Sequence, residues 1–334
     1  MELLTLGMKV FKFGGASVKD ANSVKNIAKI LTNHSDEKLI VIISAMGKMT
    51  NGFEWLINSF CYNKSKVKES LNAIVDFHNH ILWELFPDKS HKVYLAVNEL
   101  FYQIEELLEK DYNGFYDETY DSFVGYGELI STTIISHYLN SQKINNQWID
   151  ARKVIKTNSD YRQAKVNWEK TQSNIQELNS SLIISQGFIG SNQSNEMTTL
   201  GREGSDFSAA IFGYCTHAES VTIWKDVAGV LNADPKQFPD ATKIDKLSYR
   251  EAIELSYYGA TIIHPKTIKP LENKEIPLYV KSFLNPSEEG TVVQKLREFD
   301  GLKPSYIFIK DQILVSISPK DFSFIAEDNM SFIF

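Results

Sequence analysis

A lysine and two adjacent glycines end an apolar stretch in the run Lys12-Phe13-Gly14-Gly15, and these residue types are suited to binding an anion. Adjacent glycines after a strand let backbone N–H groups approach a ligand that any Cβ would hold off. Apolar side chains then recur at helical spacing over residues 24–31, and Ser17 or Asp20 is placed to cap that helix. Because a helix N-terminus attracts anions, the segment is typical of a phosphate site. A tight turn with a solvated lysine accounts for the same residues.

A second run, Gly201-Arg202-Glu203-Gly204-Ser205-Asp206, places glycines, a guanidinium and a carboxylate ahead of another predicted helix. The glycines leave N–H groups open and Arg202 adds positive charge, so the run predicts a second anion-binding corner. Asp206 lies at the start of the predicted helix, where its carboxylate can orient Lys12 or Mg²⁺. On local grounds, a favourable interaction of Asp206 with the helix dipole explains it equally well.

Glu128 follows two glycines, Gly125 and Gly127, in the first turn of a helix predicted over residues 127–139. A carboxylate in this position can bind an ammonium group, and Arg202 can hold a carboxylate through two parallel hydrogen bonds. An acid and a base that face each other describe an amino-acid site. Compensation of the helix dipole is the simpler alternative for Glu128.

Strands alternate with helices along the chain, which predicts an α/β fold, a three-layer αβα sandwich on a largely parallel sheet. Strands are predicted over residues 9–13, 39–43, 147–150, 182–190, 221–224 and 276–283, the last before a turn-rich stretch. Ligands bind at the carboxyl ends of the strands in such sheets. The loops expected to converge there follow Phe13, Ile43, Ile189 and Trp224. Residues 64–110 lack strand signals and predict a helical insertion in the N-terminal lobe, acting as a lid or a dimer surface.

Composition disfavours several classes of function. The chain has 334 residues, a formal net charge of −7 and no basic run, which argues against nucleic acid as a partner. Its two cysteines, Cys61 and Cys215, lie far apart without a metal-ligand pattern, as in a protein of a reducing compartment. The N-terminus lacks a signal-peptide pattern and no apolar run is long enough to span a bilayer. We therefore expect a cytoplasmic protein with no membrane partner.

An acidic run of turn residues follows the strand predicted to end at Trp224, and it includes Asp226, Asn232 and Asp234. Its position at a strand end suits a ligand pocket. Ordinary turn chemistry is the simpler interpretation for Asn232 and Asp234 taken singly.

Six short blocks of residues follow one another along the chain. They are Lys12-Phe13-Gly14-Gly15-x-Ser17-Val18, Ser44-Ala45-Met46-Gly47-x-x-Thr50-Asn51, Gly127-Glu128, Gly201-Arg202-x-Gly204-Ser205-Asp206, Asp226-Val227-x-Gly229-x-x-x-Ala233-Asp234-Pro235 and Gly259-Ala260-x-x-x-His264-Pro265. On these blocks the chain resembles the aspartokinases and is identified as a member of the amino acid kinase superfamily. The resemblance implies a kinase domain over residues 8–295, with an aspartate site in the N-terminal lobe and a nucleotide site in the C-terminal lobe. Residues 303–334 resemble the start of an ACT regulatory module and are expected to form an incomplete ACT-like domain.

The resemblance implies an ATP-dependent aspartate kinase, which transfers the γ-phosphate of ATP to the side-chain carboxylate of L-aspartate. Mg²⁺ would bridge the phosphates, and the product would lead towards lysine, threonine and methionine. The implied roles are catalysis for Lys12 and Asp206, substrate binding for Ser44, Thr50, Glu128, Arg202 and Ser205, and nucleotide binding for Lys12, Gly14, Gly15, Lys225, Asp226, Asp234, Lys236 and Thr261. The resemblance also implies a homodimer. It implies no residue that binds a metal directly. Two alternatives stay open: another small-acid kinase of the superfamily, of the glutamate type, and a non-catalytic amino-acid sensor.

Departures from the family's pattern fall mainly on the nucleotide side. The family usually has Thr at Ala16 and Lys225, Gly at Glu203, Arg at Lys236 and a nucleotide-contacting Lys at Thr261. The lost cation at Thr261 removes charge near the phosphates. A nearby lysine can compensate because its ammonium group is a movable point charge. We therefore expect nucleotide affinity to be retained but altered.

Overall fold

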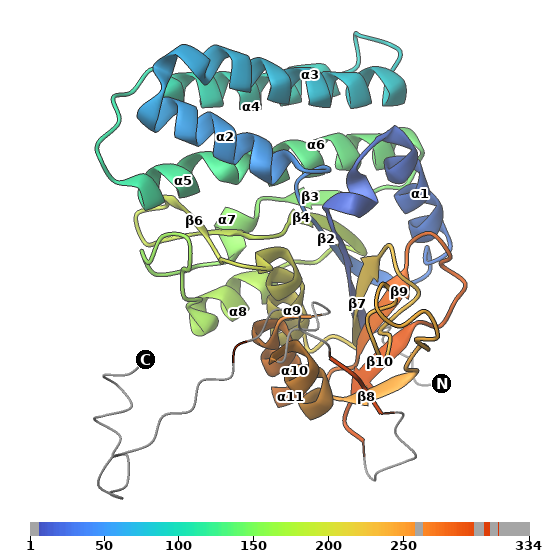
Figure 1. Ribbon diagram of the computed structural model, residues 1–334. Helices are drawn as coiled ribbons and strands as arrows, with labels where there is room; N and C mark the ends of the chain where they lie inside the picture. Colours follow the sequence, from blue (N-terminus) through green and yellow to red (C-terminus); the bar gives the residue numbers. More distant parts are fainter. Residues whose placement is uncertain (1–6, 258–262, 297–303, 308–312, 314–334) are drawn as a thin grey trace, which may run out of the picture.

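The computed structural model describes residues 7–257, 263–296, 304–307 and 313. At its centre is an eight-stranded sheet in the order β3-β4-β2-β1-β7-β9-β10-β8, and all neighbouring strands pair in parallel except β9 and β10 (Figure 1). The strands are β1 (Met8–Phe13), β2 (Lys38–Ile43), β3 (Gln147–Ile149), β4 (Leu182–Gln186), β7 (Ser220–Lys225), β8 (Lys246–Ser248), β9 (Leu278–Ser282) and β10 (Thr291–Gln294). This sheet confirms the predicted α/β fold.

The middle strands are buried because their sequences are apolar along almost their whole length. β2 reads KLIVII, and every residue after Lys38 is buried, as a strand covered on both faces requires. β1 lies between β2 and β7, with Phe13 paired to Ile43 on one side and Trp224 on the other. The carboxyl ends of these three strands therefore meet at one edge of the sheet, where folds of this kind bind ligands.

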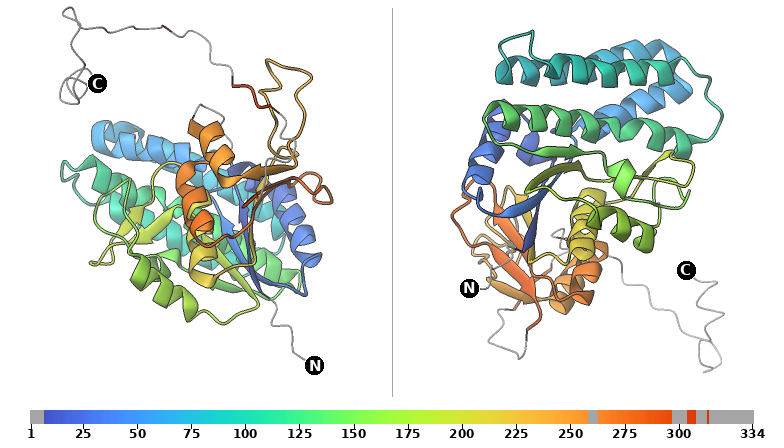
Figure 2. Two further views of the ribbon diagram at one scale, coloured as in Figure 1. Left: turned by 90° about the horizontal axis from the view of Figure 1, so that it is seen from below. Right: turned by 180° about the vertical axis from the view of Figure 1, so that it is seen from behind.

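Helices cover both faces of the sheet, with α1 and α6 on one face and α9 and α11 on the other (Figures 1 and 2). The helices are α1 (Ala21–Thr32), α2 (Met49–Tyr62), α3 (Val67–Leu85), α4 (Val93–Leu108), α5 (Tyr116–Val124), α6 (Tyr126–Ser141), α7 (Ala151–Val154), α8 (Trp168–Gln176), α9 (Gly204–Thr216), α10 (Tyr249–Tyr257) and α11 (Pro265–Asn273). Two short 3₁₀ helices are η1 (Gly15–Val18) and η2 (Lys64–Lys66). Asp20, one of the two predicted caps, begins α1 by accepting a hydrogen bond from the Ser23 N–H.

The helical insertion predicted at residues 64–110 is present as η2, α3 and α4. α3 and α4 lie furthest from the sheet, α3 against α2 and α4 against α6 (Figure 1). Their inward faces carry buried apolar side chains such as Ile74 and Ile104. The layer covers α6, whose first turn carries Glu128. The predicted role of this insertion as a lid or a dimer surface stays a prediction.

β4 is shorter than the strand predicted over residues 182–190, because it ends at Gln186. A Cβ on Gly187 would lie 2.5 Å from the Cβ of Ser205, and Phe188 has a left-handed φ of 71°, so the chain turns sharply at these two residues. The next residues form β5 (Ile189–Ser191), which pairs antiparallel with β6 (Met197–Thr199). The loop expected after Ile189 therefore begins after Gln186.

The strand predicted over residues 276–283 is present as β9, but it is not the last strand of the sheet, because β10 follows it. β10 has four residues and pairs with β9 and β8. Strands this short carry little sequence signal. Most of residues 303–334, the expected ACT-like segment, lies outside the described residues. Of the described part, the Tyr306 N–H donates to the Asn232 carbonyl at 2.7 Å. The predicted domain boundaries stay predictions.

Candidate active site

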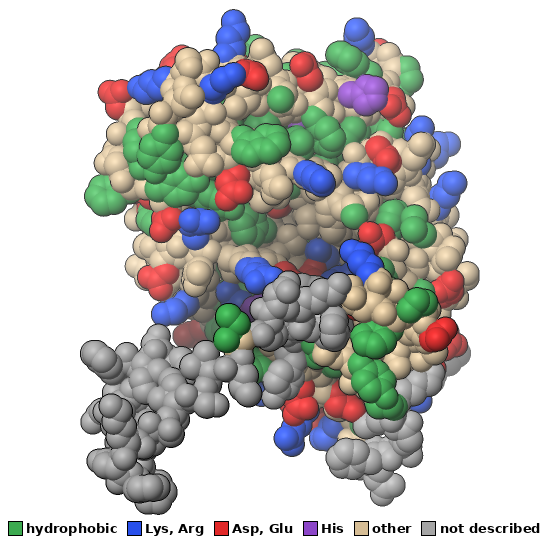
Figure 3. All heavy atoms as spheres, in the orientation of Figure 1, with side chains coloured by type: hydrophobic (Ala, Val, Ile, Leu, Met, Phe, Trp, Pro, Cys, Tyr) green, Lys and Arg blue, Asp and Glu red, His purple; other side chains and the backbone are tan. Residues whose placement is uncertain are grey.

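The carboxyl ends of β1, β2 and β7 open into a cavity of about 1190 Å³. Figure 3 shows this face of the molecule hollowed at mid-height, with Lys and Arg side chains around the hollow. The walls come from the loops after these strands, the first turns of α6 and α9, and residues 160–165. This is the edge of the sheet at which the sequence predicts a ligand.

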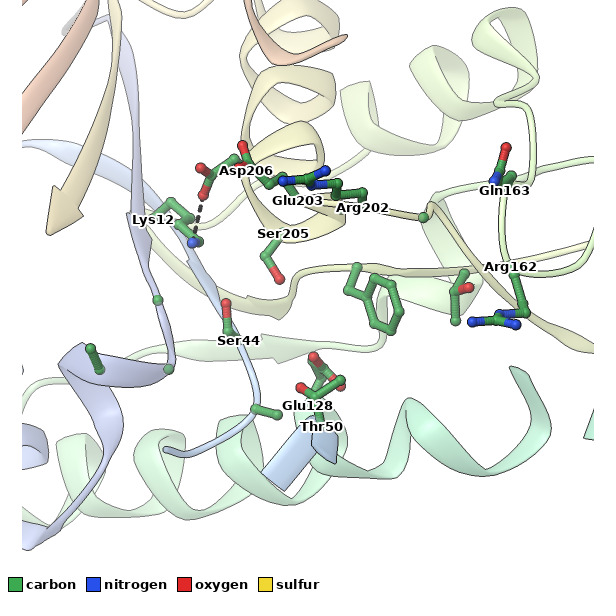
Figure 4. A pocket seen from close by; sticks show the side chains of 18 of the residues that line it. Lys12, Ser44, Thr50, Glu128, Arg162, Gln163, Arg202, Glu203, Ser205 and Asp206 are labelled. Carbon is green, nitrogen blue, oxygen red and sulfur yellow. Dashed lines mark ion pairs between the residues drawn. The ribbon is translucent and has the colours of Figure 1, made fainter. Parts of the chain in front are cut away.

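Lys12, on β1, forms an ion pair with Asp206 in the first turn of α9. Lys12 Nζ lies 2.5 Å from Asp206 Oδ1, and both side chains are almost buried (Figure 4). Lys225 Nζ lies 4.0 Å from the other carboxylate oxygen of Asp206. Asp206 is therefore flanked by two ammonium groups, which is one of the two roles that the sequence left open for it. The ion pair holds the Lys12 ammonium group at the cavity, and Lys225 adds a positive charge beside it.

The glycine turn after β1 is required by the close approach of the loop after β2. The Gly47 N–H donates to the Gly15 carbonyl at 3.1 Å, and a Cβ on Gly15 would lie 2.5 Å from the Gly47 oxygen. Side chains larger than hydrogen are thus excluded from Gly15. The contact also fixes the loop that starts at Ser44, which lines the cavity together with Thr50 of α2.

Glu128, in the first turn of α6, is a buried carboxylate that faces the cavity (Figure 4). Its Oε2 has no hydrogen-bond partner among the described residues. Burial raises the pKa of Glu128 to about 8, although the backbone N–H groups of Ala45 and Glu128 itself and the charge of Lys12 favour its ionised form. A buried carboxylate with an open oxygen is suited to accept an ammonium group from a ligand.

The N-terminus of α9 brings Arg202, Ser205 and Asp206 to the cavity. Arg202 is exposed and has no ion pair within the part of the chain that the structure describes. Ser208, one turn further along, accepts a hydrogen bond from the Phe188 N–H and donates one to the Gly204 carbonyl, both at 2.9 Å. The helix start is therefore fixed while the guanidinium of Arg202 stays available to a ligand.

Several residues that line the cavity carried no functional signal in the sequence, among them Tyr120, Arg162 and Phe188. The guanidinium carbon of Arg162 lies 4.5 Å from the centroid of the Tyr120 ring, and its Nη1 lies 3.3 Å from Asp117 Oδ1. Arg162, Phe188 and Glu203 are non-glycine residues with positive φ. Such conformations cluster at functional sites, and they are a signal that only the structure reveals.

The structure brings most of the predicted site residues into this one cavity. Those that line it are Lys12, Gly14, Gly15, Ser44, Thr50, Glu128, Arg202, Ser205, Asp206, Lys225 and Asp226. Asp234 and Lys236 are exposed and do not line it; the Lys236 N–H donates to Asp234 Oδ1 at 2.9 Å, which is ordinary turn chemistry. Thr261 lies outside the described residues. The nucleotide-binding roles of these three residues stay predictions.

Carboxylates at the cavity do not form a metal cage. Within the described ranges, no group of three or more His, Cys, Asp or Glu side chains is placed to hold a metal ion. Both oxygens of Asp206 are close to ammonium groups, while Asp226 is exposed at the end of β7. This donor set suits Mg²⁺ that arrives on the phosphates of a nucleotide, because Mg²⁺ is commonly held by one or two carboxylates and by substrate oxygens.

None of the described helices has both the length and the apolar character that crossing a bilayer needs.

Comparison with known proteins gives a consistent result. The model of the amino acid kinase family matches residues 7–282. The chain is 33% identical over 299 residues to the chloroplastic bifunctional aspartokinase/homoserine dehydrogenase 2 of Arabidopsis thaliana, covering 87% of this chain and 33% of that protein. It is 32% identical over 314 residues to lysine-sensitive aspartokinase 3 of Escherichia coli K12, covering 92% of this chain and 69% of that protein. The chain thus spans about a third of the bifunctional Arabidopsis relative and about two thirds of the E. coli one.

A solved structure extends the likeness to three dimensions. E. coli aspartokinase III in complex with aspartate and ADP matches with a TM-score of 0.80 and 32% sequence identity, over 87% of this chain and 65% of that chain. The complex of the same enzyme with lysine and aspartate gives a TM-score of 0.79.

Proposed function

The chain belongs to the amino acid kinase family, and within it to the aspartokinases; from this we propose that it phosphorylates the side-chain carboxylate of L-aspartate with ATP. The product would be 4-phospho-L-aspartate, an intermediate on the way to lysine, threonine and methionine. One observation carries the proposal: a buried carboxylate with an open oxygen, Glu128, shares a cavity with the Lys12–Asp206 pair. The E. coli relative whose fold matches was solved with aspartate and ADP, which supports the same pair of ligands.

In the proposed complex, Glu128 binds the ammonium group of aspartate and Arg202 its α-carboxylate. Both interactions are charge-assisted, so each also selects against acids that lack the matching group. The hydroxyl groups of Ser44, Thr50 and Ser205 add hydrogen bonds around the substrate. The side-chain carboxylate of aspartate would then lie towards Lys12, near the N-terminus of α9.

ATP would enter from the end of β7, past Lys225 and Asp226, with its phosphates towards the glycine turn at Gly14 and Gly15. Mg²⁺ bound to ATP would supply neutralisation of charge on the phosphates, with Asp226 as the exposed carboxylate nearby. Lys12 would contact the γ-phosphoryl group during transfer, and Asp206 would hold the Lys12 ammonium in place.

The chemical step needs no general base, because the attacking carboxylate is already ionised at neutral pH. An oxygen of the aspartate side chain forms a bond to the γ-phosphorus while the bond from that phosphorus to the β,γ-bridging oxygen breaks. ADP carries the electron pair away, and no covalent enzyme intermediate forms. The protein positions the two substrates and stabilises the charge that spreads over the γ-oxygens, mainly through Lys12.

The test is a hydroxamate assay for acyl phosphate with aspartate, glutamate and N-acetylglutamate as acceptors. We expect product with aspartate and none with the longer acids. Lys12→Ala should lower kcat by at least about 10²-fold while leaving aspartate binding largely intact. Lys9→Ala is the matched control, since Lys9 lies on the same strand and bonds Glu37 at 2.9 Å outside the cavity.

Each result of the assay has a definite meaning. Product with glutamate alone would identify another small-acid kinase of the same family. No product with any of the three acids, from a protein that still binds aspartate, would leave the amino-acid sensor. Equal loss of activity in Lys9→Ala and Lys12→Ala would contradict the assigned role of Lys12.

A further inference from the structure

The loop that carries Arg202 has an unusual residue at its end. Glu203 is the N-cap of α9 with a left-handed backbone, φ 53° and ψ 29°, although its side chain makes no capping bond to that helix. Glycine adopts this conformation without steric cost, whereas glutamate does not. The side chain of Glu203 therefore needs a compensating interaction elsewhere.

That interaction is with the start of α11. Glu203 Oε2 accepts a hydrogen bond from the His264 N–H at 2.9 Å, across 61 residues of sequence. His264 is the N-cap of α11, so the carboxylate lies where the helix dipole favours a negative charge. Glu203 thereby ties the loop before α9 to a second helix.

The same helix also holds the other side of the loop. Lys266 Nζ donates to the Leu200 carbonyl at 2.8 Å and lies 4.6 Å from the centroid of the Phe207 ring. Leu200 and Glu203 flank the short stretch that contains Arg202 in the sequence. A bond from Lys266 to the Leu200 carbonyl and a bond from the N-cap of α11 to the Glu203 side chain thus hold the loop on both sides of Arg202.

The bond to His264 also concerns the negative charge of Glu203, which lies close to the guanidinium group of Arg202. Glu203 and Arg202 are neighbours in the sequence and lie side by side at the cavity (Figure 4). A free carboxylate in this position would compete with a ligand for the guanidinium group. Glu203 Oε2 instead accepts the His264 N–H, and Arg202 has no ion pair within the described part of the chain.

We propose that Glu203 is a positioning residue for Arg202: its bond to the His264 N–H fixes the loop and keeps the guanidinium free for the carboxylate of the acid substrate. This inference rests on the proposed function, since it assigns the acid to Arg202. It goes beyond that function by making the affinity for the acid depend on a contact with α11.

The experiment compares Glu203→Gly, Glu203→Ala and Glu203→Gln. Glycine relieves the backbone strain and removes the acceptor, alanine removes the acceptor alone, and glutamine keeps an acceptor oxygen without the charge. We expect KM for aspartate to rise about three- to tenfold in the glycine and alanine variants, with KM for ATP and kcat within about twofold of the parent. Glutamine should restore most of the affinity for aspartate.

Glu251→Ala is the matched control. Glu251 Oε2 accepts a hydrogen bond from the Ser248 N–H at 2.8 Å at the start of α10, and it does not line the cavity. Its loss should lower the melting temperature and leave KM for aspartate unchanged. Both glutamates accept a hydrogen bond from a backbone N–H at the start of a helix, and only Glu203 is next to Arg202.

A KM for aspartate within twofold of the parent in both Glu203→Gly and Glu203→Ala would overturn the inference. So would equal rises in both substrates' KM values, which would indicate general destabilisation. Hydrogen exchange of the Arg202 to Ser205 amides separates this inference from the proposed function. If the parent phosphorylates no acid, the proposed function falls, and unchanged exchange in Glu203→Ala would overturn the fixing of the loop as well.

Discussion

The half of the cavity that we assign to the acid differs in construction from the half that we assign to the nucleotide. The acid half, formed by Ser44, Thr50, Glu128, Arg202 and Ser205, comes from a strand end and the first turns of helices. The nucleotide half follows β7, where Lys225 and Asp226 line the cavity; Asp226 is exposed, as are Asp234 and Lys236 in the turn beyond the cavity. The central carboxylate of the acid half, Glu128, is buried, whereas the carboxylate of the nucleotide half, Asp226, is solvated.

This difference indicates which half of the cavity determines selectivity between substrates. A carboxylate fixed in a low-dielectric site interacts strongly with a matching charge and rejects ligands that lack it. Exposed lysines and turn carboxylates interact through screened charge and adjust to the ligand. Substitutions in the acid half should therefore have large effects that are specific for one substrate. Those in the nucleotide half should have small and graded effects.

Glu128→Gln should have the largest effect on the acid half. The amide cannot pair with the ammonium group of aspartate, so we expect KM for aspartate to rise by at least about 10²-fold, with KM for ATP little changed. Steady-state kinetics with each substrate varied in turn measures both values. Similar rises for aspartate and ATP would remove the distinction between the two halves.

The same substitution should stabilise the ligand-free protein. Burial raises the pKa of Glu128 to about 8, so the folded state binds a proton that the unfolded state has lost above its ordinary pKa. Stability is thus unaffected below about pH 4.5 and falls as the pH rises towards 8. Glu128→Gln removes this cost, and at pH 8.5 thermal unfolding should show a gain on the order of 2 kcal/mol.

Asp121→Ala gives the opposite result at a neighbouring buried carboxylate. Asp121 accepts hydrogen bonds from the Thr199 N–H and Thr199 Oγ1, both at 2.7 Å, and from the Arg162 N–H at 3.0 Å. Alanine would leave the two N–H groups without this acceptor, so we expect a loss of about 2 kcal/mol in thermal unfolding. A gain in stability here would show that the contrast with Glu128 does not depend on open and satisfied oxygens.

Local rules place several of the site residues in the fold, whereas the roles assigned to them come from the family resemblance and stay predictions. Lys12 stands before two glycines at a strand end, and Glu128 and Asp206 occupy first helical turns, so each could be placed from its neighbours alone. Asp121 could not, since its partners lie 41 and 78 residues away. Arg162 and Phe188 were missed because positive φ in a non-glycine residue leaves no mark in the sequence.

The sequence likewise predicted some strands of the fold and missed others. Long apolar strands such as β2 were recognised, whereas β6, β8 and β10 have only three or four residues each and were not; most of β5 was merged with β4 into one predicted strand. Such elements exist because tertiary pairing stabilises them, not because of their own periodicity. On the nucleotide side, the simpler interpretation of Asn232 and Asp234 as turn residues matches their bonds to the Thr242 and Lys236 N–H groups.

A pH profile distinguishes the halves without any substitution. With aspartate varied, kcat/KM reports ionisation of the free site, so it should rise about 25-fold between pH 6.5 and 8.5 as Glu128 loses its proton near pH 8. With ATP varied at saturating aspartate, we expect a much flatter profile, because the bound ammonium group keeps Glu128 ionised. A flat aspartate profile would mean that Glu128 is already ionised in the free protein.

The smallest effect is expected for Lys236→Ala, in the exposed turn beyond the nucleotide half of the cavity. The side chain is exposed, and the backbone N–H, which bonds Asp234 Oδ1 at 2.9 Å, survives the substitution. KM for ATP should therefore rise by no more than about threefold, as screened surface charges allow. Lys225→Ala is the comparison: Lys225 lines the cavity with its Nζ 4.0 Å from Asp206 Oδ2, so its loss should raise KM for ATP about tenfold. A larger effect for Lys236 than for Lys225 would place the phosphates nearer the turn at Asp234, and the nucleotide half would then extend beyond the cavity.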